Sequence, residues 1–93
     1  MQDTRNMSTD TPHGRLIGLP DEQLRALAPE ATHQHRKGGL YRDLGIAYDA
    51  DTKLPLKDAA GNDRRAWLHI HPHAQALYVR SVAEDDRFRL LQP

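Results

Sequence analysis

Residues 33–48 read HQHRKGGLYRDLGIAY and contain the clearest local signals in the chain. A basic segment with two histidines precedes the pair Gly38-Gly39, and such pairs are typical of turns because glycine adopts backbone angles that other residues avoid. The apolar residues after this turn share one strand parity: Leu40, Leu44, Ile46 and Tyr48. This spacing is that of a half-buried antiparallel strand. The stretch therefore predicts a strand that begins directly after a turn.

The remainder of the chain predicts further short strands and one helix. The helix is expected near residues 20–28, because a proline and two acids begin this segment and a second proline ends it. We expect Leu24 and Leu27 to pack from one face of this helix. Gly45, in the middle of the first strand, predicts a bulge or a close backbone approach. The other segments with strand spacing are residues 66–71, 76–82 and 87–90.

Together these elements predict a mainly β protein, either a small antiparallel sheet or an SH3-like, partly open barrel with one short N-terminal helix. We expect residues 16–93 to form one small domain, and residues 1–15 to be a disordered lead-in because they show no apolar period. The chain has one tryptophan and one phenylalanine, so Trp67, Tyr78 and Phe88 are expected in the core.

Composition excludes several classes of protein. The 13 basic and 13 acidic residues cancel, so no global field steers the 93-residue chain toward nucleic acid or membrane. The absence of cysteine excludes disulfides, thiolate nucleophiles and cysteine-based zinc sites. No apolar run reaches membrane-spanning length, and the N-terminus lacks the apolar segment of a signal peptide. We therefore expect a soluble cytoplasmic protein.

A cationic patch around the Gly-Gly turn is the main candidate ligand site. Its basic side chains would hold anionic groups, the tyrosine would stack on a base, and the glycines would present backbone N–H groups. The candidate residues are Arg36, Lys37, Gly38, Gly39, Tyr41, Arg42 and Arg80. The alternative is a solvated hairpin turn, with Arg80 paired to Asp43 or another acid of the sheet.

A second candidate is a metal site at His69, His71 and His73. Side chains two residues apart on a strand project to the same face, so three imidazoles would face one Zn²⁺ or Ni²⁺. The alternative is a solvated strand face that contains histidines. Serine, histidine and aspartate occur without any spacing that links them into a catalytic motif, so no catalytic residue is assigned.

Two motifs carry a family resemblance. The first is Lys-Gly-Gly-x-Tyr at residues 37–41, which runs on to Leu44-Gly45, and the second is Tyr-Val-Arg at residues 78–80, followed by Phe88. In these motifs the chain resembles a family of small bacterial and phage proteins, the domain of unknown function 1653 family. The resemblance covers about residues 33–90, although a serine follows the second motif where the family usually has proline. It implies a compact β-rich fold and no activity.

These observations favour a small non-enzymatic binding module for an anionic ligand, which would be a nucleic acid, a nucleotide or an acidic peptide. One alternative is a histidine-based metal-binding protein or small metal-dependent enzyme that uses zinc or nickel. Another is a protein interaction or assembly factor, including a phage-related one, that forms a homodimer through an edge strand.

Overall fold

A computed structural model describes residues 13–72 and 75–93 of the chain. Its elements are η1 (Gly14–Leu16), α2 (Asp21–Leu27), β1 (His33–His35), β2 (Leu40–Ile46), β3 (Arg64–His71), β4 (Ala76–Ser81), η2 (Val82–Arg87) and β5 (Phe88–Leu90). The expected lead-in of residues 1–15 lies mostly outside the described residues, but its end belongs to the 3₁₀ turn η1. Among the described residues, no helix combines the length and apolar character needed to cross a membrane.

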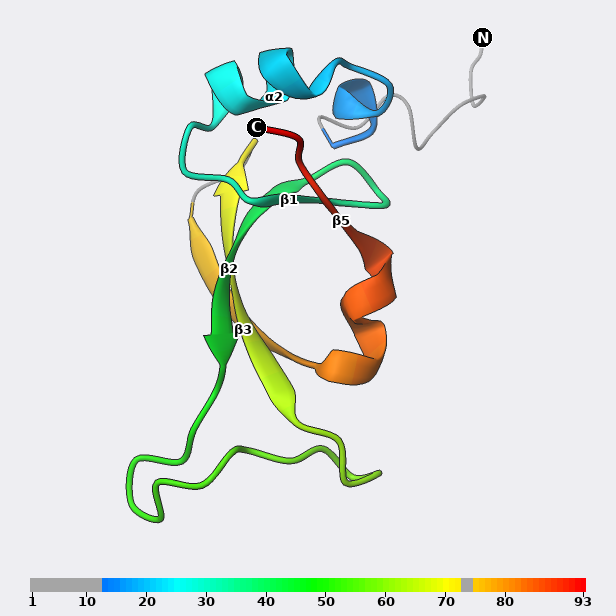
Figure 1. Cartoon of the computed structure of the whole chain (residues 1–93). Helices are drawn as coiled ribbons and strands as arrows, with labels where there is room; N and C mark the ends of the chain where they lie inside the picture. Colours follow the sequence, from blue (N-terminus) through cyan, green and yellow to red (C-terminus); the bar gives the residue numbers. More distant parts are fainter. Residues whose placement is uncertain (1–12, 73–74) are drawn as a thin grey trace, which may run out of the picture.

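The five strands form one antiparallel sheet in the order β4-β3-β2-β1-β5. The sheet curls, and η2 joins its two edge strands, β4 and β5, across the open side (Figure 1). The sheet therefore stays open and does not close into a barrel. The prediction of a mainly β protein with a small antiparallel sheet and one short helix is confirmed.

The connection between β2 and β3 is a long irregular hairpin that extends away from the rest of the sheet (Figure 1). Isolated bridges join Tyr48 to Pro55 and Lys57 to Asp63. Pro55 has no backbone N–H, which is consistent with its place outside a regular strand.

The core consists of two clusters. The first lies between the N-terminal helices and one end of the sheet, and its buried members are Leu16, Leu24, Ala28, Ala31, Leu40 and Leu91. The second cluster lies on the concave face of the sheet, and its buried members are Tyr41, Trp67 and Phe88. The rings of Trp67 and Phe88 stack with centroids 3.8 Å apart and an interplanar angle of 7°. Both residues occupy the core, as predicted.

Two expected core residues are exposed. Leu27 is 45% exposed, because the buried face of α2 continues from Leu24 to Ala28, one helical turn later. Tyr78 is 43% exposed, because it lies on the edge strand β4, where no further strand covers it. The predictions that Leu27 packs beside Leu24 and that Tyr78 is a core residue were therefore wrong.

The side chains of β2 are not all buried or exposed as the alternation in the sequence predicted. Leu40 and Tyr41 are both buried, one in each core cluster, and the pairing of β2 with β3 shifts register between them. A second shift precedes Gly45, whose φ of +92° bears out the bulge predicted at this glycine. Leu44 is the extra residue at this shift and is 47% exposed, and Tyr48, beyond the end of β2, is 60% exposed, although the parity placed both inside. A bulge reverses the faces of all residues that follow it.

Candidate functional site

The predicted cationic patch contributes to a depression of about 240 Å³, which we call the cationic pocket. Its lining residues are His13, His35, Arg36, Lys37, Gly39, Tyr41, Arg80 and Arg87. His13 precedes η1, and the others come from β1, the β1–β2 turn, β2, β4 and η2. Figure 1 shows the β1–β2 turn and η2 on the same side of the sheet. The Arg36 N–H donates to the Arg87 carbonyl at 2.8 Å, which holds the turn against η2.

The glycine pair shapes the turn. Gly38 has φ +111°, and a Cβ at this position would lie 1.7 Å from the carbonyl oxygen of His13. A Cβ on Gly39 would lie 3.1 Å from His69 Nε2, so this residue too sits tightly against the interior. The Gln34 side chain donates to the Gly38 carbonyl at 3.1 Å and secures the turn from below. Glycine is required here because the backbone approaches its neighbours closely.

A buried histidine forms part of the wall of the cationic pocket. His35 Nδ1 accepts a hydrogen bond from the backbone N–H of Lys37 at 3.1 Å, and the ring packs edge-on against Phe88. Burial, together with the charges of Arg80 and Arg36, lowers the His35 pKa to about 4. The imidazole is therefore neutral near pH 7, and because Nδ1 accepts, the proton lies on Nε2.

Two arginines of the cationic pocket share one carboxylate oxygen. Arg80 Nη1 lies 3.1 Å and Arg87 Nη1 lies 3.2 Å from Glu84 Oε1. The Arg80 guanidinium also lies over the rings of Tyr78 and Phe88, at 5.9 and 5.8 Å from their centroids. These contacts fix Arg80 in place. Its acidic partner is Glu84, whereas Asp43, the other expected partner, pairs with Arg65.

The two cations of the turn are available to a ligand. Arg36 and Lys37 are exposed, and within the described part of the chain neither side chain forms an ion pair. None of the described residues that line the cationic pocket carries a carboxylate. Glu84 offsets one positive charge from outside the lining, so the four cationic side chains keep a local excess of positive charge.

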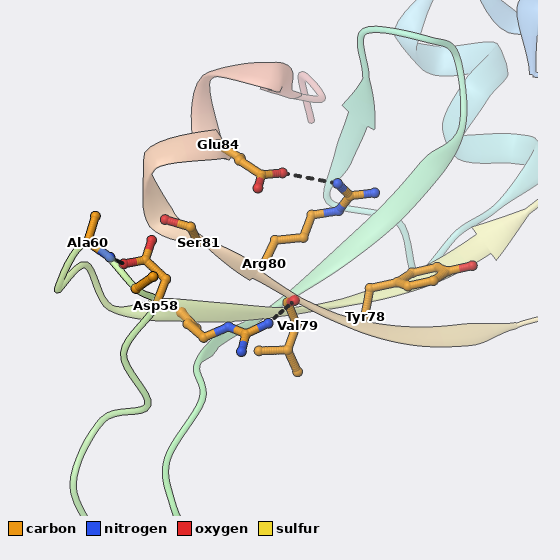
Figure 2. Close-up of a pocket in the computed structure, with 9 residues that line it drawn as sticks. Asp58, Ala60, Tyr78, Val79, Arg80, Ser81 and Glu84 are labelled. Atoms are coloured by element: carbon orange, nitrogen blue, oxygen red, sulfur yellow. Dashed lines mark hydrogen bonds and ion pairs between the residues drawn. The ribbon is translucent and has the colours of Figure 1, made fainter.

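A second depression, which we call the β4 groove, lies on the other side of Arg80 and has a volume of about 590 Å³. Figure 2 shows Tyr78 and Arg80 on the same side of β4, with the Arg80 guanidinium turned toward Glu84. At its far end a hydrogen bond from Ser81, together with backbone N–H donors, lowers the Asp58 pKa to about 2. The β4 groove therefore contains the ionised carboxylate of Asp58, and Glu84 also lines it, whereas no described lining residue of the cationic pocket is acidic.

The structure brings most of the predicted ligand residues together but separates two of them. Arg36, Lys37, Gly39 and Arg80 line the cationic pocket, and Gly38 forms its turn. Arg42 does not line it: this exposed side chain donates to the Glu30 carbonyl, because alternate residues of a strand face opposite ways.

Tyr41 lines the cationic pocket but offers no free ring face. It is 6% exposed and stacks on the His69 imidazole. Its predicted role in stacking on a base is therefore wrong, and its ring supports the pocket from within. The sequence interpretation missed His13 and Arg87, and it placed His35 in the basic segment without assigning it to the ligand site.

The three histidines of the metal hypothesis have different surroundings. His69 is buried against Tyr41 and against His13, with ring centroids 4.5 and 5.2 Å apart. His71 ends β3 and is half-buried, and His73 lies outside the described residues. Over residues 13–72 and 75–93, no three His, Cys, Asp or Glu residues are placed to hold a metal ion. Zinc or nickel binding stays a prediction.

Comparisons with protein-family models, curated proteins and solved structures give no match. The resemblance to the domain of unknown function 1653 family therefore stays a prediction, and function has to be argued from the site.

Proposed function

We propose that this protein is a non-enzymatic binding module whose cationic pocket holds an anionic group, either a phosphate or a carboxylate. The observation that carries this proposal is the convergence of four cationic side chains on one depression, where no described lining residue is acidic. They come from three separate segments, so their proximity is a product of the fold. Placing like charges together raises the free energy of the folded state, which an anion would lower again.

The chemistry of the side chains suits an oxyanion. Guanidinium groups donate paired N–H bonds to phosphate and carboxylate oxygens, and Lys37 adds a mobile point charge. Arg80 and Arg87 are held by Glu84, so two guanidinium groups need little reordering when a ligand binds. The neutral His35 contributes no charge, but its Nε2 proton is an additional donor.

Binding of tripolyphosphate, a small polyanion without a base, tests the proposal by calorimetric titration. We expect binding that weakens as salt rises from about 50 to 200 mM, because charged contacts to phosphate are screened. The double substitution Arg36→Ala and Lys37→Ala removes both unpaired cations and should weaken binding roughly tenfold or more.

Arg42→Ala is the matched control, because Arg42 is a neighbouring cation that lies outside the cationic pocket. Its affinity for tripolyphosphate should stay close to that of the unaltered protein. An absence of binding at low salt, or an equal loss in the control, would show that the proposal is wrong.

A further inference from the structure

An exposed aromatic ring adjoins the cationic pocket. Tyr78 is 43% exposed, and the Arg80 guanidinium carbon lies 5.9 Å from its ring centroid. Tyr78 pairs in register with Trp67, so its ring lies on the concave side of the sheet, at the edge of the second core cluster. Arg80 lines both the cationic pocket and the β4 groove that contains Tyr78. A single arginine therefore connects an anion site to an open ring.

The other rings near this site already have partners. Tyr41, Trp67 and Phe88 are 6%, 2% and 8% exposed, and they stack on one another or on histidines. Tyr48 is 60% exposed but lies in the hairpin beyond β2 and lines neither depression. Within the described residues, Tyr78 is thus the aromatic side chain at this site with surface left for a ligand.

We propose that the ligand is single-stranded nucleic acid, with one base stacked on Tyr78 and its phosphate in the cationic pocket against Arg80. This inference rests on the function proposed above. Aromatic platforms beside cationic grooves are the usual means of binding single strands, because every base has a stacking face. The geometry requires an unpaired base, since a base inside a duplex is covered on both faces by its neighbours.

The charges around Tyr78 favour a base over an acidic peptide. Asp58 and Glu84 line the β4 groove together with Tyr78 (Figure 2). Their carboxylates would repel the side chains of an acidic peptide, whereas they can accept hydrogen bonds from the exocyclic amino groups of bases. Arg64 and Arg80 also line this groove and balance the two carboxylates, so the base side has no excess positive charge to attract an acidic peptide, whereas the phosphate side is cationic.

The test measures fluorescence anisotropy of a labelled single-stranded DNA of mixed sequence and about ten nucleotides, a length within known site sizes. Tyr78→Ala should weaken binding roughly tenfold, and Tyr78→Phe, which keeps the ring, should stay within about twofold of the unaltered protein. Tyr48→Ala is the matched exposed-tyrosine control and should bind as the unaltered protein does. Tripolyphosphate affinity should stay the same in all three variants.

An abasic strand of the same length isolates the ring contact. The unaltered protein should bind it as weakly as Tyr78→Ala binds the full strand. Equal affinity for both strands, unchanged binding by Tyr78→Ala, or equally tight binding of an oligoglutamate peptide would overturn the inference. If tripolyphosphate still binds in that case, the proposed function stands and only the nucleic-acid assignment fails. If the Arg36→Ala and Lys37→Ala double variant binds tripolyphosphate normally, the proposed function itself fails.

Discussion

The phenol ring of Tyr41 stacks on the imidazole of His69, with centroids 4.5 Å apart and an interplanar angle of 15°. This pair forms the inner support of the cationic pocket, because a Cβ on Gly39 would lie within 3.2 Å of both rings. A tyrosine that the motif places next to basic residues is thus a packing residue.

The stacking predicts a large cost for truncating Tyr41. Tyr41→Ala should lower the free energy of unfolding by about 3–5 kcal/mol, the range for removal of a buried aromatic side chain. Tyr48→Ala removes the same side chain at a 60% exposed position and should change the free energy by less than about 0.5 kcal/mol. Urea denaturation measures both values, and similar losses in the two variants would contradict the buried stack.

Substitution of Gly38 tests the effect of a steric clash, separately from the cost of a positive φ angle. Gly38→Ala would bring a Cβ to 1.7 Å from the His13 carbonyl oxygen, whereas Gly61→Ala, also at positive φ, meets open space. Gly61→Ala should cost about 1–2 kcal/mol for the left-handed conformation alone. Gly38→Ala should cost an additional 1–3 kcal/mol or so, because the turn must move away from η1. Thermal unfolding measures both variants, and equal decreases in Tm would show that the close approach of Gly38 to His13 does not matter for stability.

The buried His35 predicts a loss of stability in mild acid. Its pKa is about 4 in the folded protein against 6.5 for an ordinary histidine, so the unfolded chain binds more protons between these values. Its contribution is complete above about pH 6.5 and disappears as the pH falls toward 4, a loss on the order of 1–3 kcal/mol. His33, whose pKa is also lowered by burial, adds to this slope.

Unfolding free energies measured across this pH window test the assignment. His35→Gln keeps an acceptor for the Lys37 N–H and should flatten the slope between pH 6.5 and 4 without abolishing it. The carboxylates of Asp21 and Asp58, with pKa values of about 2, lose their contributions only below about pH 4. A slope that His35→Gln leaves unchanged would place the acid sensitivity elsewhere.

Removal of the Glu84 charge should strengthen the binding of tripolyphosphate to the cationic pocket. The Glu84 carboxylate joins Arg80 and Arg87 and lowers the positive potential of the cationic pocket. Glu84→Gln keeps a hydrogen-bond acceptor and should strengthen tripolyphosphate binding about two- to fivefold, as expected for one half-buried charge at close range. Asp86→Asn makes the same change in net charge at an exposed position of η2 and is the control. Equal gains would indicate a general charge effect.

Several features of the fold followed from local sequence alone. The Gly-Gly turn, the bulge at Gly45, the short helix after Pro20 and the strand segments depend on the preferences of neighbouring residues, which the sequence displays directly. The cluster of Arg36 and Lys37 is also local, because the two residues are adjacent in one turn. These parts of the site needed no partner from elsewhere in the chain.

Contacts between distant segments decided which side chains of β2 are buried and which residues form the cationic pocket. Alternation alone placed Leu44 inside, but Leu44 is the extra residue at the register shift before Gly45 and is exposed. Tyr41, which was expected to contact a ligand, is buried in the second core cluster. Gly45 indicated a bulge, but the pairing with β3 decided which residue is the extra one and therefore which side chains turn to the other face. Arg87 and Arg80 reach the turn only because η2 folds across the open side of the sheet, a long-range contact that no local pattern encodes.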